Sequence, residues 1–357
     1  MRVPRRRGAG PVIVLDHMSP LKVLFIGGTG EISAGCSHRA VEAGIELYVL
    51  NRGTTSIRPL PPEARRLHAD VRDPDSVRAA IGDHEFDAVA NFLAFTPEHV
   101  RSDLELFAGR TRQYVFISSA SAYQKPVARL PIVESTPLRN PVWPYSQAKI
   151  ACEDLLVSAY RRDGFPVTIV RPSHTYDHTN VPCEGGWTVI ERMRRGQEIV
   201  VHGDGTSLWT LTHHTDFAKG FVGLLGHPQA IGDSFHITSD EVLTWNQIHE
   251  ILAAAAGTEA RIVHVASDTI FAEDERWGRS LLGDKAHSVI FDNAKLRALV
   301  PDYTATTPFV QGAREIVEWH DADPARRRVD AETDALIERL SGRHRMSGRP
   351  ALDEVHR

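Results

Sequence analysis

The chain has 357 residues, of which 24% are charged and 42% hydrophobic, and its formal net charge is −5. These values are ordinary for a globular protein long enough to bury a large core, and they give no electrostatic argument for binding nucleic acid or a membrane. No apolar run approaches the roughly 20 residues of a membrane-spanning helix. Three cysteines (Cys36, Cys152 and Cys183), widely spaced and without a CxxC pair, favour reduced thiols in the cytoplasm over a disulfide framework.

The first residues, Met1–Pro20, do not match a folded element. Arg5-Arg6-Arg7 precede a brief apolar stretch at Pro11–Leu15, whereas a secretory signal needs about 7–15 apolar residues and a small-residue cleavage site. We therefore predict a disordered tail over residues 1–20, with Met18 as an alternative start. Arg-rich targeting is the other interpretation of this segment.

Short apolar segments alternate with helical segments through the first half of the chain. The first, Lys22–Ile26, runs into Gly27-Gly28-Thr29-Gly30 and then a helix to about Ala43. A repeated order of strand, turn, helix and strand is typical of α/β proteins with a Rossmann-type, doubly wound parallel sheet. Further strands are expected at Glu46–Leu50, Arg65–His68, Ala88–Asn91 and Tyr114–Ile117, with helices near Asp75–Ile81 and Pro97–Ala108.

The pattern loosens in the second half. A long helix over Tyr145–Arg161 and an apolar strand over Val167–Val170 still fit the alternation. From Arg171 onward, loops rich in Gly, His and Pro separate shorter elements, which predicts a smaller C-terminal lobe. Helices are expected there at Thr188–Arg195, Asp216–Leu225, Trp245–Ala256, Asn293–Leu299 and Phe309–His320.

The turn after the first strand carries Gly27-x-x-Gly30-x-x-Ser33 where the strand becomes a helix. Gly27 can take the tight turn, and Gly30 lets the backbone approach a pyrophosphate at the helix N-terminus. Ser33 replaces the third glycine of the usual fingerprint with a residue small enough for close helix–strand packing. In this context the pattern predicts a dinucleotide site, with an ordinary strand-to-helix turn as the alternative.

The ends of the second and third strands bear on which dinucleotide binds. An acidic residue at the end of the second strand usually binds the ribose 2′-hydroxyl. Here that position is Asn51, and Arg52 follows it. Asparagine does not repel a 2′-phosphate and a guanidinium can pair with one, which leans slightly towards NADP; the alternative is that Arg52 is a solvated surface charge. Asp70 is placed either to meet the adenine or to cap the turn before Val71-Arg72-Asp73.

Tyr145 and Lys149 stand four residues apart on the predicted long helix and so project from the same face. A nearby ammonium favours the phenolate and makes the phenol a base near neutral pH. A hydride leaves a carbinol carbon only as its oxygen loses a proton, so such a base must lie beside the hydride acceptor. Ser118-Ser119 ends the strand upstream, and this order of motifs strengthens the prediction.

With these motifs the chain resembles the extended short-chain dehydrogenase/reductase family, the NAD-dependent epimerases and dehydratases typified by UDP-galactose 4-epimerase. The resemblance runs from about Lys22 to His320. The matching segments are Gly27–Ser33, Val115–Tyr123, Tyr145–Lys149, Arg171-Pro172 and Asp204–Asp216.

The resemblance implies roles for individual residues. Tyr145 would take the substrate's hydroxyl proton, Lys149 would hold the nicotinamide ribose and depress the tyrosine pKa, and Ser119 would hydrogen-bond the reacting oxygen rather than merely cap a strand. Substrate contacts are expected from Ser121, His174 and Trp209. NAD or NADP contacts are expected from Gly27, Thr29, Gly30, Glu31, Ile32, Asn51, Arg52, Asp70, Val71, Asn91, Phe92, Ser118, Tyr145, Lys149 and Pro172.

Two departures from the family pattern concern the substrate. Dehydratases place an Asp-Glu pair after the active-site serine or threonine, where this chain has Ala120 and Ser121, so dehydration is disfavoured. Sugar-nucleotide members hold the pyrophosphate with two arginines, and here those positions are Trp209 and Leu281. Few side chains replace a guanidinium at a phosphate; Arg276 or Arg279 from a shifted loop are candidates, and Trp209 can instead stack on a sugar.

Histidines near the predicted site suggest a metal only at first sight. The spacings among His174, His178, Cys183, His213 and His214 match no ligand motif, and the family needs no metal, so none is expected. His174 either contacts the substrate or packs within its loop.

We therefore predict an NAD(P)-dependent epimerase or oxidoreductase acting on a sugar or sugar-nucleotide carbinol. A retained cofactor makes it an isomerase, and a released one makes it a dehydrogenase or an NADP-dependent reductase of a non-nucleotide substrate. The rival class is an RNA-binding protein, because some plant relatives with this fold bind RNA; the retained Tyr145 and Lys149 and the lack of basic excess make nucleic acid unlikely.

The expected domains are a dinucleotide-binding domain over residues 21–172, with contributions from 203–235, and a substrate lobe over 173–325. A charged extension over 326–357 is expected to fray. The resemblance further implies a homodimer packed through the Tyr–Lys helix and its neighbour. Apolar positions that permit this are Leu104, Leu106, Phe107, Ile150, Leu155 and Leu156.

Overall fold

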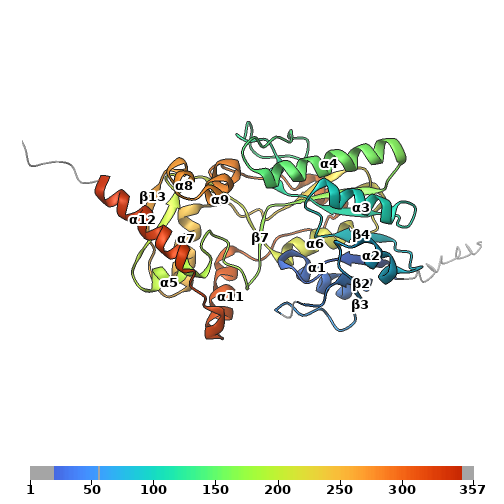
Figure 1. Cartoon of the computed structure of the whole chain (residues 1–357), viewed down its shortest axis with the longest axis horizontal. Coiled ribbons are helices and arrows are strands. Elements are labelled where there is room, and N and C mark those ends of the chain that lie inside the picture. Colours follow the sequence, from blue (N-terminus) through green and yellow to red (C-terminus); the bar gives the residue numbers. More distant parts are fainter. Residues whose placement is uncertain (1–19, 55–56, 348–357) are drawn as a thin grey trace, which may run out of the picture.

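The computed structural model describes residues 20–54 and 57–347, and only the backbone of residues 343–347 (Figure 1). The tail predicted for residues 1–20 therefore lies outside the described residues, apart from Pro20. No helix within the described ranges combines the length and apolar character needed to cross a bilayer.

A seven-stranded parallel sheet forms one half of the molecule, in the order β11-β6-β5-β4-β1-β2-β3. The Rossmann-type α/β fold is confirmed. Successive strands are laid down outward from β1 in both directions, so the order reverses between β1 and β4, where such sheets bind their ligands. The strands are β1 (Lys22–Ile26), β2 (Glu46–Asn51), β3 (Arg65–His68), β4 (Ala88–Asn91), β5 (Tyr114–Ile117), β6 (Val167–Pro172) and β11 (Ser234–Ile237).

Helices cover both faces of this sheet. Val23 and Phe25 of β1 pack with α1 and α6 on one face, whereas Leu24 and Ile26 pack with α2, α3 and α4 on the other. Because β1 is buried on both faces, it is an unbroken apolar run rather than an alternating one. These helices are α1 (Glu31–Glu42), α2 (Pro74–Ile81), α3 (Pro97–Phe107), α4 (Pro144–Asp163) and α6 (His214–Leu224).

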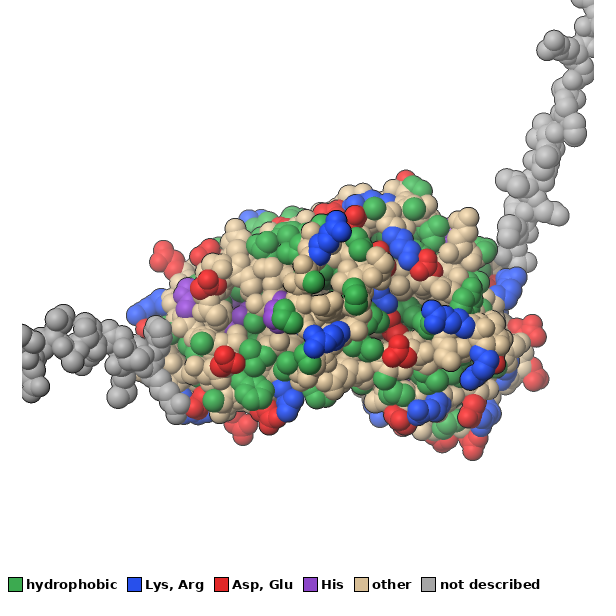
Figure 2. All heavy atoms as spheres, turned by 90° about the horizontal axis from the view of Figure 1, so that it is seen from above, with side chains coloured by type: hydrophobic (Ala, Val, Ile, Leu, Met, Phe, Trp, Pro, Cys, Tyr) green, Lys and Arg blue, Asp and Glu red, His purple; other side chains and the backbone are tan. Residues whose placement is uncertain are grey.

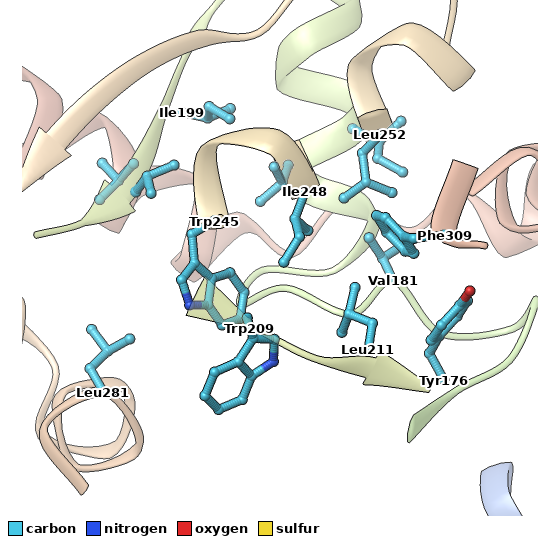
Figure 3. Packing of buried hydrophobic residues seen from close by; sticks show 14 of the residues in the cluster. Tyr176, Val181, Ile199, Trp209, Leu211, Trp245, Ile248, Leu252, Leu281 and Phe309 are labelled. Atoms are coloured by element: carbon cyan, nitrogen blue, oxygen red, sulfur yellow. The ribbon is translucent and has the colours of Figure 1, made fainter. Parts of the chain in front are cut away.

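The other half, on the left in Figure 1, has its own hydrophobic core. Figure 3 shows part of it, with the Trp209 and Trp245 indoles beside one another at a centroid distance of 5.2 Å. Its strands pair in three short sheets: β7 (His174–Tyr176) with β10 (Leu211–His213), β8 (Glu198–His202) with β13 (Arg261–Val265), and β9 (Leu208–Trp209) with β12 (Leu243–Thr244).

Most helices of this half lie within a residue or two of the predicted ranges, and α8 and α9 were not predicted. The helices are α5 (Trp187–Arg194), α7 (Trp245–Ala255), α8 (Ser267–Glu273), α9 (Glu275–Ser280), α11 (Phe309–Asp321) and α12 (Ala331–Ser347), with α10 (Ala294–Leu299) packed near β11. Shorter helical turns are Ala120–Ala122, Pro228–Ala230, the π-helical Leu281–Lys285, and Pro324–Arg326.

The C-terminal helix α12 packs on this core. Leu336, Ile337 and Leu340 are buried in it, and the buried Arg192 guanidinium pairs with Asp334 at 2.6 Å and Glu338 at 2.8 Å. The expectation that the extension frays is therefore wrong over residues 331–342, because an apolar face and a buried cation hold the helix in place.

The helix faces expected to form a dimer are partly used within the chain. Leu106 and Phe107 of α3 and Leu156 of α4 lie in the core beneath the sheet. These three side chains are therefore not available at a surface, whereas Leu104, Ile150 and Leu155 are only partly buried.

Candidate active site

A cavity of about 670 Å³ opens at the carboxyl ends of β1 to β6, over the point where the strand order reverses. At its floor Gly27 and Gly28 have positive φ angles of 115° and 83°. A Cβ on Gly28 would come within 2.5 Å of Val49 Cγ1, so this turn requires glycine. Gly30 is the N-cap of α1, and its N–H donates to Ser33 Oγ at 2.8 Å. Ser33 therefore shapes the turn as well as being small.

The predicted cofactor residues gather around this cavity, with one exception. Asn91 does not line it: its side chain donates to Asp103 at 2.6 Å and accepts from the Leu93 N–H at 2.7 Å, so it shapes the chain after β4. The residues that line the cavity are Gly27, Thr29, Gly30, Glu31, Ile32, Asn51, Arg52, Asp70, Val71, Phe92, Ser118, Tyr145, Lys149 and Pro172.

At the far end of the cavity, Asn51 accepts a hydrogen bond from the Gly53 N–H at 3.0 Å, and Arg52 is exposed at the rim. Asp70 accepts from the Arg72 N–H at 2.9 Å, as expected for a residue that caps this turn. It also lines the cavity, and its contact with an adenine stays a prediction. The Arg72 guanidinium, which sequence reasoning did not single out, lines the same end and donates to the Leu93 carbonyl at 2.7 Å.

Two polar contacts link the residues beside the glycine turn to the segment Asp177–Asn180. Arg58 lies on the cavity wall and pairs with Asp177 at 2.5 Å, and it also donates to Thr179. Asn180 donates to Glu31 at 2.8 Å at the N-terminus of α1. Burial and the nearby Asp177 carboxylate raise the pKa of Glu31 to about 7. No local sequence signal marks Arg58, whose partner Asp177 lies 119 residues later.

Lys149 is held by backbone carbonyls. Its Nζ donates to Ala94 O and Ile117 O, each at 2.7 Å, and lies 5.9 Å from the centroid of the Tyr145 ring. Burial lowers the pKa of Lys149 to about 8. Tyr145 and Lys149 share a helix face as predicted, and the two carbonyls hold the Lys149 ammonium at the end of β5.

The predicted depression of the Tyr145 pKa is not found. Desolvation raises the pKa of Tyr145, a hydrogen bond with Ser119 acts in the opposite direction, and the Asp284 carboxylate raises the pKa further. The reason is geometric: Lys149 is engaged with two carbonyls, whereas Ser119 is the group that contacts the phenol.

Serine hydroxyls form a chain behind the phenol. Ser119 and Ser121 hydroxyls lie 2.9 Å apart, and Ser146 donates to Ser121 at 2.7 Å. Ser118 turns the other way and donates to Glu153 at 2.5 Å. The Ser119 hydroxyl is therefore oriented by its hydrogen bond with Ser121, whereas the Ser118 hydroxyl is bound to the buried Glu153 carboxylate.

A smaller cavity of about 290 Å³ adjoins the first. The two cavities share a wall made of Ser119, Tyr145, Pro172, Ser173 and His174. The expected substrate residues Ser121, His174 and Trp209 all line the smaller cavity. Several other lining residues were not predicted, because no local motif marks them; they include Trp143, Asp284, Lys285 and Phe291.

His174 is held as a neutral ring. Its Nδ1 accepts from Trp209 Nε1 at 3.1 Å, and burial lowers its pKa to about 3. A neutral histidine whose Nδ1 is an acceptor carries its proton on Nε2. His174 therefore packs against Trp209 and also lines the smaller cavity, where its contact with a substrate stays a prediction.

The arginines suggested as pyrophosphate ligands are placed elsewhere. Arg276 pairs with Glu184, and Arg279 donates to Glu275 at 2.9 Å and to Val142 O at 3.1 Å. Neither lines the smaller cavity, and Leu281 is buried. The suggestion that either arginine replaces the missing pair is therefore not supported by this arrangement.

The histidine cluster forms ordinary contacts. His213 bonds Glu315 at 3.0 Å, and the ring of His178 packs on Trp319. Within residues 20–54 and 57–347, no group of three or more His, Cys, Asp or Glu residues has an arrangement that could hold a metal ion.

Comparisons with known proteins agree with this architecture. The model of the NAD dependent epimerase/dehydratase family matches residues 23–238. The chloroplast stem-loop binding protein of 41 kDa b from Arabidopsis thaliana is 29% identical over 278 residues, covering 74% of this chain and 70% of that protein. A UDP-glucose 4-epimerase from Lactobacillus helveticus is 32% identical over 169 residues, covering 42% of this chain and only about half (51%) of that enzyme.

Among solved structures, the UDP-glucose 4-epimerase of Thermotoga maritima with UDP-glucose superposes with a TM-score of 0.69. The match covers 85% of this chain and 99% of that one, at 19% identity. At this identity the likeness is evidence of the shared fold.

Proposed function

This chain belongs to the NAD dependent epimerase/dehydratase family, and we propose that it is an NAD(P)-dependent epimerase or oxidoreductase acting on the carbinol of a sugar or sugar nucleotide. One observation carries the proposal: Tyr145 and Ser119 stand in the wall shared by the cavity above the glycine turn and the smaller cavity. A hydroxyl bound in the smaller cavity would lie beside both the base and the dinucleotide.

The residues present fit a dinucleotide. The glycine turn at the N-terminus of α1 leaves backbone space and N–H groups for a pyrophosphate, and Lys149 stands where it would hold the nicotinamide ribose. When bound, the nicotinamide supplies hydride transfer to and from the carbinol carbon. The protein's part is to place the reacting hydroxyl at that ring and to manage its proton.

Tyr145 would accept the proton of the carbinol oxygen as the hydride leaves carbon, and would return it when the carbonyl is reduced. Ser119 would donate to the same oxygen, since its own hydroxyl is oriented by Ser121 and Ser146. The hydrogen bond with Ser119 favours the phenolate, whereas burial and the Asp284 carboxylate disfavour it. Dehydration is disfavoured because Ala120 and Ser121 supply no carboxylate there.

We infer a preference for NADP from Arg52, which lines the far end of the larger cavity and could pair with a 2′-phosphate. Whether the cycle is an epimerisation or a net oxidation depends on cofactor retention. Denaturing the purified protein and identifying the released nucleotide tests this: stoichiometric oxidised cofactor supports the epimerase, and an empty protein supports a dehydrogenase or reductase.

Tyr145→Phe tests the proposal as a whole. Turnover should fall by roughly 10²- to 10⁴-fold, the usual contribution of a positioned acid–base, while nucleotide binding is retained. Tyr160→Phe, at an exposed position of the same helix, is the matched control. Unchanged turnover in Tyr145→Phe refutes the assignment of the base, and failure to bind either NAD or NADP refutes the proposed function.

RNA binding is the second candidate, because the relative from Arabidopsis thaliana named as a stem-loop binding protein matches 74% of this chain. The formal net charge of −5 provides little counterion release on a phosphate backbone. A gel shift with a stem-loop RNA at increasing salt distinguishes the two: salt-sensitive binding supports the RNA function, and no shift at low salt rejects it.

We further propose that the enzyme is a cytoplasmic homodimer, with its three free thiols kept reduced. The partly buried apolar residues Leu104, Ile150 and Leu155 on α3 and α4 are the remaining candidates for the dimer contact. Light scattering of the purified protein measures the oligomeric state directly, and a monomer at micromolar concentration would contradict the dimer.

A further inference from the structure

The π-helical turn Leu281–Lys285 delivers a carboxylate and an ammonium to the smaller cavity. The two charges are not equivalent. Asp284 pairs with the buried Lys125 ammonium at 3.0 Å, so the negative charge of Asp284 is already balanced by Lys125. Lys285 is the cation that remains.

The Lys285 ammonium has no carboxylate of its own. Its Nζ lies 5.4 Å from the centroid of the Trp143 ring, and among the described residues it forms no ion pair or hydrogen bond. Its backbone is fixed, because the Lys285 carbonyl accepts from His202 Nε2 at 3.0 Å and from Trp245 Nε1 at 3.1 Å. The Asp284 and Glu184 carboxylates attract the partly buried Lys285 charge from a distance, but each is in contact with another cation, Lys125 and Arg276. A ligand anion would supply the contact that Lys285 lacks.

The same cavity is poorly equipped for a nucleoside diphosphate. Arginine is the side chain suited to bidentate phosphate contacts, and no arginine of the described residues lines this cavity. Its volume of about 290 Å³ stands at the lower end of the range for small-molecule sites. These dimensions suit a single sugar-sized ring.

We propose that the substrate is a sugar or polyol that carries one anionic group, a carboxylate or a phosphate monoester, which binds Lys285. The carbon skeleton would lie against the aromatic side chains of Trp143 and Phe291, with the reacting hydroxyl at Tyr145. His174 Nε2–H would donate to another hydroxyl. This inference rests on the proposed function and narrows its substrate from a sugar nucleotide to a compact acidic sugar.

The test is a set of binding titrations on the full chain saturated with NADP or NAD. The probes are D-galacturonate and D-glucose 6-phosphate for the two anions, D-glucose as the neutral sugar, and UDP-glucose. We expect one of the anionic sugars to bind roughly 10- to 100-fold more tightly than glucose, as for a hydrogen bond to a charged group, and more tightly than UDP-glucose. The uronate and phosphate arms identify the anion.

The variant Lys285→Met should abolish the difference between anionic and neutral sugars, and Lys285→Arg should retain part of it. Lys295→Met, which removes an ammonium paired with Asp233 outside both cavities, should change nothing. If Lys285→Met does not fold, Lys285→Gln takes its place.

Equal binding of charged and neutral sugars, tighter binding of UDP-glucose, or an unchanged preference in the Lys285 variants overturns the inference. Cofactor binding, measured on the same samples, distinguishes failure of this substrate inference from failure of the proposed function. A protein that binds no dinucleotide refutes the function, whereas a cofactor-bound protein without anion preference refutes only the substrate class.

Discussion

The Arg171 guanidinium forms a buried two-pronged ion pair with Glu153, with Nε 3.0 Å from Oε1 and Nη2 2.6 Å from Oε2. Glu153 Oε1 also accepts the Ser118 hydroxyl, and Arg171 donates to the Tyr123 hydroxyl at 3.2 Å. The pair thereby joins α4 to β6 and, through Ser118, to the end of β5, next to Ser119.

Arg171→Leu should lower the free energy of unfolding by about 3–5 kcal/mol, because it leaves the Glu153 carboxylate buried without a cation. Urea unfolding followed by circular dichroism measures the loss. Arg162→Leu removes an exposed arginine of α4, the helix that carries Glu153; Arg162 pairs with Asp163, and its loss should leave stability unchanged. Equal losses of unfolding free energy in the two variants would contradict a stabilising role of the buried Arg171–Glu153 pair.

Glu31 should make cofactor affinity depend on pH. Its pKa is raised to about 7, so its carboxyl changes from mostly neutral at pH 6 to mostly ionised at pH 8, beside the turn proposed to bind the pyrophosphate. Affinity for NADP should therefore fall roughly 5-fold over this interval, about 1 kcal/mol of repulsion. Calorimetric titrations of Glu31→Gln should show a flatter pH profile, while Glu42→Gln near the other end of α1 keeps the original slope.

The same residue affects stability with a defined sign. Because the folded-state pKa of Glu31 exceeds its usual value of 4.5, the folded protein binds more protons than the unfolded chain between about pH 4.5 and 7. Its contribution to stability is therefore lost as pH rises through that window. Glu31→Gln should be relatively more stable than the parent at pH 8 than at pH 4, as read from thermal unfolding; a reversed order would exclude Glu31 as the source.

Arg52 should select between the two dinucleotides. Arg52→Ala removes the guanidinium expected to pair with the 2′-phosphate, so the dissociation constant for NADP should rise roughly 10-fold while that for NAD stays constant. Arg66→Ala, an exposed arginine on β3 outside the cavity, is the matched control. An equal loss for NAD and NADP would show that Arg52 contacts a part common to both.

Arg192 should hold the C-terminal helix. It also donates to the Glu198 carbonyl at 2.8 Å, so Arg192→Met removes charge-assisted bonds to α12 and to the start of β8, at a cost of about 2 kcal/mol. Hydrogen exchange over residues 331–342 should become faster. Arg195→Met removes an exposed pair with Glu191 and should leave this exchange as it was; loss of protection in both variants would point to a general destabilisation.

The parallel sheet was largely predictable because its central strands are buried on both faces and appear as continuous apolar runs between turn residues. The prediction missed β11, Ser234–Ile237, since its short sequence is not set off by an apolar run. Its place beside β6 comes from pairing over more than 60 residues of chain. In the C-terminal lobe, two- and three-residue strands such as β9 and β10 have no periodicity of their own and exist only through their partners.

The candidate site likewise combines features that follow from the local sequence with features that depend on contacts between distant segments. The glycine turn and the Tyr145–Lys149 spacing are local, because helix geometry and backbone torsion are set by residues a few positions apart. The amino-acid sequence by itself therefore determined the family, the first six strands of the sheet and most of the wall of the larger cavity. The tertiary structure alone decided that Lys149 donates to the Ala94 and Ile117 carbonyls, that Arg58 pairs with Asp177, and that Lys285 lines the smaller cavity. Those outcomes depend on contacts between segments that are distant in the chain, and the distances between them are set only once the chain has folded.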